Sequence, residues 1–232
     1  MQPKQKLHYI YIKNMFESLL NKLINFDKFL MVMLNYDGGD IQDMIWWCIS
    51  SRLIWVPIAL TLIVYMLRDT KKWKQAVVMI LAIALIVTIC DQVSSTLMKP
   101  YFARLRPSHT PGLENLLHYV YGYHGGKYGF PSSHAANAFG SVTFVALLLR
   151  NRIATILLFA FAFMVSYSRI YLGVHFPIDI FVGSMLGILT GTLVYKALPR
   201  RCHQHLVLDK TAIKAIYPYP LPAFILRFTK SA

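Results

Sequence analysis

The chain has 232 residues, of which 56% are hydrophobic and 15% are charged, and its formal net charge is +14. Soluble domains carry about 25% charged residues, so this composition excludes an ordinary soluble protein and indicates one membrane domain. Much of the positive charge lies beside apolar segments, where basic residues set topology and contact anionic lipid. No nucleic-acid-binding motif occurs, so the bilayer, and not a nucleic acid, is the expected partner.

An amphipathic helix is the first predicted element, at residues 15–34. Its apolar side chains fall near one stripe (Phe16, Leu19, Leu20, Leu23, Leu30 and Leu34), and its polar ones fall elsewhere (Glu17, Asn21, Lys22, Asp27 and Lys28). This pattern favours a helix lying in the membrane interface. The stretch "NYDGGD" at 35–40 breaks it. We therefore divide the chain into an N-terminal segment (1–43), a membrane core (44–198) and a basic cytoplasmic tail (199–232).

Five membrane spans follow in the sequence, because a span needs about 20 mostly apolar residues. They cover about 44–67, 76–98, 133–149, 153–171 and 176–197. The predicted fold class is all-α, a multi-pass transmembrane helix bundle. Six spans are the alternative, if the helix at 15–34 also crosses the bilayer.

Topology follows from the basic residues that flank the spans. The connectors at 68–75 and 150–152 and the tail are rich in Lys and Arg, and five spans place all three on one side, which should be cytoplasmic. The loop at 99–132 then lies on the other side, facing outward. Five lysines before residue 30 conflict with this arrangement, and a sixth span would resolve the conflict.

Polar groups from four chain segments collect at that outer face, by span parity alone. Lys99 ends the second span, Ser133 and His134 begin the third, Arg169 lies near the end of the fourth, and His175 precedes the fifth. Taken singly, such residues are more often structural, since arginines at span ends extend to the interface. Together they indicate a functional site.

A cluster of cations with few acids suits an anion with several oxygens. Lys99, Arg106 and Arg169 repel one another unless such an anion lies between them, and phosphate fits the forked donors of arginine. His175 and Asp179 are four residues apart at a predicted helix start, so the carboxylate points back toward the imidazole. A carboxylate on one ring nitrogen makes the other a better nucleophile or base.

Three sequence motifs carry a family resemblance. The stretches "KPYFARLRP" (99–107), "PSSH" (131–134) and "SRIYLGVHFPID" (168–179) occur in this order. They resemble the motifs K-x6-R-P, P-S-G-H and S-R-x5-H-x3-D of the type 2 phosphatidic acid phosphatase superfamily, over roughly residues 25–197. That superfamily also includes vanadium haloperoxidases and bacterial acid phosphatases. Ser133 stands where the family has glycine, which offers its backbone N–H to the phosphate.

The resemblance implies a role for each motif residue. His175 would be the nucleophile, Asp179 would orient it, and His134 would protonate the leaving oxygen and then activate water. The phosphoryl oxygens would be held by Lys99, Arg106, Ser132, the backbone of Ser133, and Arg169. Fixed cations can stabilise the charge that develops during phosphoryl transfer, so we expect a metal-independent enzyme without a cofactor.

Two neighbouring features have open interpretations. Arg52 and Asp91 should both lie roughly 12 Å below the outer face, which predicts a structural ion pair, although one of them could border the pocket instead. The aromatic, glycine-rich loop at 118–130 is either an interfacial belt or a lid that recognises a headgroup through Lys127 and Tyr128.

The predicted function is an integral-membrane lipid phosphatase that acts through a phosphohistidine intermediate. We expect it in a bacterial inner membrane, with the active site facing the periplasm. The resemblance suggests undecaprenyl diphosphate or lipid A as substrate, with phosphatidylglycerophosphate and phosphatidic acid as alternatives. A lipid phosphotransferase using the same site stays open. The sequence carries no prediction of the oligomeric state.

Overall fold

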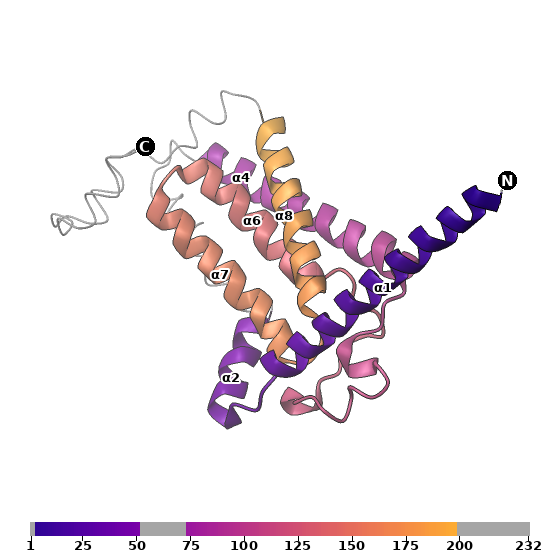
Figure 1. Ribbon diagram of the computed structural model, residues 1–232. Helices are drawn as coiled ribbons and strands as arrows, with labels where there is room; N and C mark the ends of the chain where they lie inside the picture. Colours follow the sequence, from indigo (N-terminus) through magenta and orange to yellow (C-terminus); the bar gives the residue numbers. More distant parts are fainter. Residues whose placement is uncertain (1–2, 52–72, 199–232) are drawn as a thin grey trace, which may run out of the picture.

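The computed structural model describes residues 3–51 and 73–198. Within these ranges it contains helices and no strand, so the all-α prediction is confirmed (Figure 1). The long helices are α1 (Pro3–Leu34), α2 (Gly39–Ser50), α4 (Trp73–Asp91), α6 (Ser133–Leu149), α7 (Arg152–Tyr171) and α8 (Pro177–Ala197). A π-helical segment, η2 (Gln92–Met98), and a short helix, α5 (Lys99–Phe102), extend α4, and the loop that follows contains the 3-10 turns η3 (Pro107–His109) and η4 (Val120–Gly122).

Three of the described helices are long and apolar enough to cross a membrane: Val77–Phe102, Arg152–Tyr171 and Pro177–Ala197. The helix Ser133–Leu149 is apolar but shorter. These bounds confirm a helical membrane bundle. The predicted first span, at 44–67, lies mostly outside the described residues, so the count of five spans stays a prediction. Its described part differs from the prediction, because α2 begins at Gly39 and ends at Ser50, where the extended backbone of Ser51 follows.

The extension of α4 corrects the predicted end of the second span. The helix was expected to stop at residue 98, but helical turns continue to Phe102 through η2. Pro100 lies just after the π-helical segment η2, and local π adjustments are one way in which a membrane helix accommodates a proline. Lys99 therefore lies within a continuous helical segment, just after a π-helical stretch of the kind often found at functional sites.

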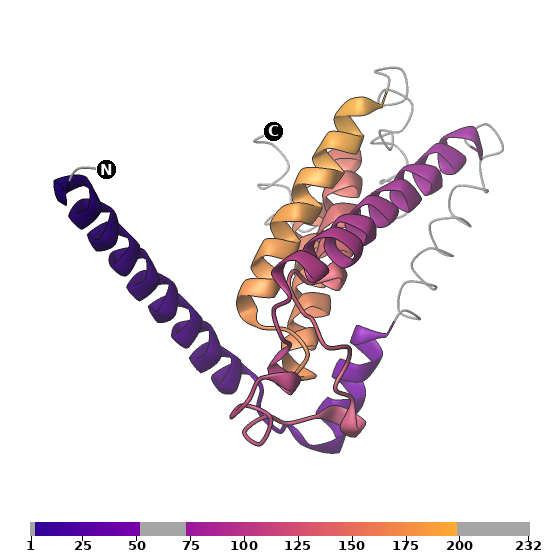
Figure 2. The ribbon, with the colours of Figure 1, turned by 90° about the vertical axis from the view of Figure 1, so that its right-hand side faces the viewer.

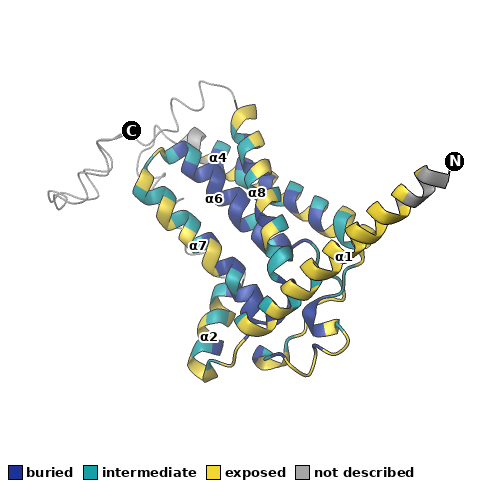
Figure 3. Ribbon diagram, viewed as in Figure 1, coloured by how far each residue is buried: buried dark blue, intermediate teal, exposed yellow. Residues whose placement is uncertain are grey.

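Helix α6 is the centre of the bundle. It packs against α4, α7 and α8, and Figure 3 shows it buried along most of its length. Its core contacts include Phe144 and Leu148 beside Ile86 of α4, and Phe139 beside Val165 of α7. Since α6 begins with the second sequence motif, its central place fixes that motif relative to the other helices.

A stripe of glycines lets α8 approach α6 closely. A Cβ atom on Gly187 would lie 2.3 Å from the carbonyl oxygen of Ala136, and one on Gly191 would lie 2.4 Å from that of Gly140. Small residues at a spacing of four are typical of close helix contacts in membranes. This contact brings the first turns of α6 and α8 together at one end of the bundle. We call this end, with the loop at 103–132, the site end; the end at Leu149 and Ala197 is the opposite end.

Helix α1 differs from its prediction in two respects. It begins at Pro3 rather than near residue 15, and it diverges from the bundle toward its N-terminus (Figure 2). Asp27, predicted to lie among the polar side chains outside the apolar stripe, is only 1% exposed. It is buried because Arg104 and the backbone N–H of Ile178 both donate to it. The location of α1 in the membrane interface stays a prediction.

Candidate active site

Lys99 meets the beginning of α6 at the site end. Its ammonium group donates to the Ser133 hydroxyl at 2.7 Å and to Ser95 at 3.3 Å. Ser133 therefore uses its side chain for a contact that glycine could not make. Ser132 is fully buried, and its hydroxyl caps α6 by accepting from the backbone N–H of Ala135 at 3.4 Å, which leaves the first N–H groups of the helix at the site.

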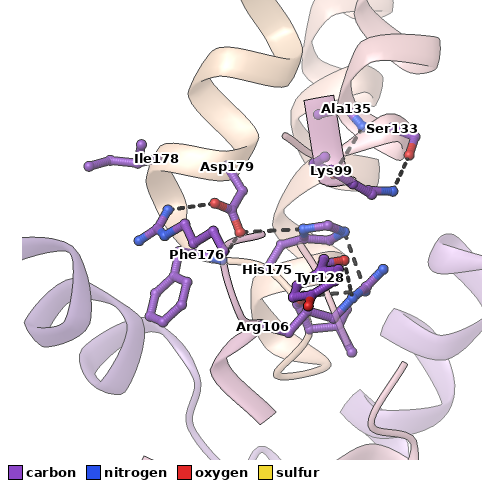
Figure 4. Close-up of polar contacts among 12 residues, drawn as sticks. Lys99, Arg106, Tyr128, Ser133, Ala135, His175, Phe176, Ile178 and Asp179 are labelled. Atoms are coloured by element: carbon purple, nitrogen blue, oxygen red, sulfur yellow. Dashed lines mark hydrogen bonds and ion pairs between the residues drawn. The ribbon is translucent and has the colours of Figure 1, made fainter. Parts of the chain in front are cut away.

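His175 and Asp179 lie side by side at the start of α8 (Figure 4). One carboxylate oxygen, Oδ2, is 3.5 Å from the Nδ1 atom of His175 and accepts from the backbone N–H of Phe176 at 3.0 Å. The other ring nitrogen, Nε2, is 3.5 Å from a guanidinium nitrogen of Arg106, which also donates to the carbonyl of Val174 at 3.3 Å. The two imidazole nitrogens thus face opposite charges.

A cavity of about 270 Å³ contains two further motif residues. It is lined by Trp47, Ser50, Ser51, Tyr123, His134, Arg169 and Leu172. Arg169 is 4% exposed, donates to the Ser50 hydroxyl and lies 5.8 Å from the centre of the Tyr123 ring. The cavity therefore joins motif residues to side chains of α2 and of the 118–130 loop. Sequence reasoning did not assign Trp47, Ser50 or Tyr123 to the site, because no local pattern brings them to it.

The electrostatics of the site disfavour additional positive charge. Burial lowers the pKa of Arg106, and the neighbouring Arg169 lowers it further. Burial also holds the pKa of His175 well below its usual 6.5, and the cations of Arg106, Arg169 and Lys99 act in the same direction. His175 is consequently a neutral imidazole at physiological pH, with a lone pair available on one nitrogen.

The loop at 118–130 supports Arg106 through its backbone. The carbonyl of Lys127 accepts from the Arg106 backbone N–H at 3.0 Å, and that of Tyr128 accepts from the Arg106 side chain at 3.2 Å. The Lys127 ammonium lies 5.5 Å from the centre of the Tyr128 ring. Recognition of a headgroup by these two side chains stays a prediction.

The predicted pair of Arg52 and Asp91 is not tested, because Arg52 lies outside the described residues. Asp91 accepts from the side-chain amide of Asn137 on α6 at 3.2 Å. This contact gives Asp91 a described partner within the bundle, as expected for a carboxylate in an apolar helix.

Two charged residues next to the motifs were missed by the sequence reasoning. Arg104 lies between Asp27 and Asp179 and donates to both at 2.5 Å. A signal was present, because Arg104 is two residues before Arg106, and alternate residues of an extended segment share one side. Asp27 is likewise four residues from Leu23 and from Met31, which places it on the apolar stripe.

A separate polar group also lies at the ends of α1, α2 and α7. Asp37, Asp43 and His118 are close enough together to hold a metal ion. However, Asp43 accepts from the Tyr171 hydroxyl at 2.7 Å and lies 2.9 Å from Nε2 of His118. Hydrogen bonds thus account for its partners, and the group lies outside the three motifs.

Comparison with known proteins agrees with the motifs. A model of the PAP2 superfamily matches residues 71–202. The chain is 37% identical to the lipid A 4'-phosphatase of Porphyromonas gingivalis, over 75% of this chain and 73% of the relative. It is 36% identical to the lipid A 4'-phosphatase of Bacteroides thetaiotaomicron, over 76% and 79%. The crystal structure of Aquifex aeolicus LpxE matches with a TM-score of 0.54 and 26% identity, over 72% of this chain and 93% of that one.

Proposed function

Because the chain belongs to the PAP2 superfamily and is a membrane-embedded phosphatase, we propose that it removes phosphate from a glycolipid of the lipid A type. The observation that carries this choice is the cavity wall. His134 and Arg169 share the cavity with Trp47 and Tyr123, whose rings lie 5.5 Å apart at an angle of 85°. Aromatic side chains with a few convergent polar groups suit a ring that has an apolar C–H face and a polar rim, so this wall fits a sugar that carries the phosphate.

The proposed first step transfers the phosphoryl group to His175. The lone pair on Nε2 forms a bond to phosphorus while the bond from phosphorus to the lipid oxygen breaks. Asp179 faces Nδ1 at 3.5 Å and stabilises the positive charge that the ring acquires. Arg106 lies beside Nε2, where the phosphoryl oxygens would be, and fixed cations stabilise the charge on these oxygens.

His134 is proposed to handle the protons of both steps. It lines the same cavity as Arg169, and the negative oxygens of a phosphate bound there would compensate a proton on its ring. It gives that proton to the departing lipid oxygen. In the second step it takes a proton from water, which attacks phosphorus, breaks the bond to His175 and releases inorganic phosphate.

The orientation of the site forms part of the proposal. Arg150, Arg152 and Lys196 are exposed at the opposite end, as expected for a cytoplasmic side, so we infer that the site end faces the periplasm of an inner membrane. In a Cys48→Ser/Cys202→Ser background, the variant Lys127→Cys should react with an impermeant maleimide in spheroplasts, whereas Arg150→Cys should react only after the membrane is opened. The reverse labelling would contradict this orientation.

Phosphate release from purified protein in detergent tests the reaction. The substrates are bisphosphorylated lipid A, undecaprenyl diphosphate, phosphatidylglycerophosphate and phosphatidic acid, with His175→Ala as the inactive control. We expect the highest kcat/KM for lipid A and no effect of a chelator. Phosphate release from none of them, or a phosphorylated acceptor in its place, would contradict the hydrolase. A preference for another lipid would contradict only the substrate.

The variant Trp47→Ala tests the cavity wall separately. It should raise the KM for lipid A about tenfold or more, by analogy with the loss of one aromatic anchor, while changing phosphatidic acid turnover little. An equal effect on both substrates would show that Trp47 does not contact the sugar.

A further inference from the structure

Arg104 links two buried carboxylates that come from distant parts of the chain. Its guanidinium nitrogens donate at 2.5 Å to Asp27 of α1 and at 2.5 Å to Asp179 of α8. The side chain of Arg104 is 24% exposed, whereas both carboxylate side chains are fully buried. Buried carboxylates are stable only when their charge is compensated, and one planar guanidinium has enough donors to serve both.

Each carboxylate uses its second oxygen to hold the start of α8. Asp27 accepts from the backbone N–H of Ile178 at 3.0 Å, and Asp179 accepts from that of Phe176 at 3.0 Å. The Phe176 ring lies 4.4 Å from the guanidinium carbon of Arg104. The first turn of α8, which directly follows His175, is therefore held by both acids and by the arginine between them.

The backbone around Arg104 explains why it points to this place. Leu105 forms an isolated antiparallel bridge with Tyr128, and the carbonyl of Arg104 accepts from the backbone N–H of Gly129 at 2.9 Å. In such an extended segment, Arg104 and Arg106 lie on the same side. Arg106 meets Nε2 of His175, and Arg104 meets the carboxylate that faces Nδ1.

We propose that Arg104 is a positioning residue of the phosphatase reaction, which holds one oxygen of Asp179 so that the other stays opposite His175. Asp27 anchors Arg104 from α1. Only Oδ2 of Asp179 faces the imidazole, at 3.5 Å, and Oδ1 is the atom that Arg104 binds. Rotation of the carboxylate would break the bond to Arg104, so the bridge fixes the orientation of the acid. The inference rests on the proposed function, because it assigns Arg104 to the same reaction.

Kinetics of purified variants separate a positioning role from a merely structural one. The variants are Arg104→Ala, Asp179→Asn and their double mutant, with Arg150→Ala as a matched loss of arginine at the opposite end. Misplacement of a reacting group by about 1 Å can cost on the order of 100-fold, so Arg104→Ala should lower kcat by about that factor with little change in KM. The double mutant should be no slower than Asp179→Asn, because Arg104 acts through Asp179.

Two results would overturn the inference: an unchanged kcat in Arg104→Ala, or losses that multiply in the double mutant. If Arg104→Ala does not fold, Arg104→Lys and Asp27→Asn decide the question. An ammonium group lacks the fork that serves both acids, so Arg104→Lys should fold and lose much of its kcat, and Asp27→Asn should lose less. Full activity in both would contradict the proposal.

The same assays distinguish a wrong function from a wrong role for Arg104. If the wild-type protein and Arg150→Ala release no phosphate from any lipid, the phosphatase assignment is wrong. If both are active and the Arg104 variants match them, only the role of Arg104 is wrong.

Discussion

The two ends of the helix bundle carry arginines in opposite environments. At the opposite end, Arg150 is exposed and its guanidinium lies 3.4 Å from the Tyr195 hydroxyl. At the site end, Arg106 and Arg169 are 9% and 4% exposed. Burial of a cation is costly unless an anion compensates it. The buried carboxylates of Asp27 and Asp179 are both bound by Arg104, so the proposed function assigns Arg106 and Arg169 to the phosphate of the substrate.

The cations at the two ends of the bundle therefore differ in whether their positions are fixed. Exposed cations at the opposite end are compatible with lipid headgroups and require no fixed geometry. At the site end, backbone carbonyls and Ser50 hold the buried arginines, and Ser133 holds the half-buried Lys99. Under the proposed function, the same residue type is therefore a topology signal at one end and part of a preorganised phosphate site at the other.

Loss of the nucleophile should have the largest effect. We expect His175→Ala to lower kcat by on the order of 10⁴-fold or more, as for removal of a nucleophile in other enzymes. Incubation with phosphate-labelled lipid followed by denaturation should leave label on the wild-type chain but not on the variant. Labelling of the variant would place the phosphoryl group on another residue.

Replacement of one buried cation should cause the next largest loss of activity. Arg106→Gln should lower kcat/KM by about 10²- to 10³-fold, the usual cost of losing one preorganised donor. It should also raise the pKa of His175, because one of the cations that lower it is removed. Since His175 must be neutral to attack, the acid limb of the kcat/KM profile should move to higher pH.

The limb should still lie below the usual histidine range, because burial, the larger cause of the low pKa of His175, remains in the variant. Asp179, Arg169 and Lys99 also face the ring and are unchanged by the substitution. An acid limb that stays in place, or moves to lower pH, would show that Arg106 does not influence this imidazole.

Disruption of the contact between α6 and α8 should reduce activity less than the substitutions above, but it should clearly lower stability. Gly187→Ala adds a methyl group where a Cβ atom would be 2.3 Å from the carbonyl oxygen of Ala136. Overpacking of this kind costs about 1–3 kcal/mol. A small shift of α8 relative to α6 should lower kcat by about tenfold, less than the roughly 100-fold loss caused by a displacement of about 1 Å. Thermal unfolding in detergent measures the first effect. Gly126→Ala, whose added methyl meets no atom within 4 Å, is the control.

Much of the fold could be predicted from the sequence because apolar length and basic flanks are local signals. The bounds of α6, α7 and α8 lie within one residue of the predicted spans. The continuation of α4 through η2 was not predictable from hydropathy, because Lys99 and Pro100 resemble the end of a span. Residues 3–14 were missed in α1 because their polar and basic side chains interrupt the apolar ones.

The motifs likewise predict some residues of the site but not the contacts between distant parts of the chain. The motifs place Lys99, Arg106 and Arg169 in one cluster, and the structure brings them together near His175. The bridge from Asp27 to Asp179 joins residues more than 150 positions apart through Arg104, and part of the cavity wall comes from α2. No spacing rule reaches across such separations, so these contacts required the structure.

A substitution at the opposite end should change activity least, and it tests the contrast between the two ends of the bundle. Arg150→Ala removes an exposed guanidinium whose described partner is the Tyr195 hydroxyl at 3.4 Å. Exposed substitutions usually change stability by less than about 0.5 kcal/mol, so kcat/KM should stay within about twofold and the melting temperature should barely move. A loss of kcat/KM comparable to that of Arg106→Gln would mean that an exposed charge affects the reaction from the far end of the bundle. The contrast between buried and exposed arginines would then be wrong.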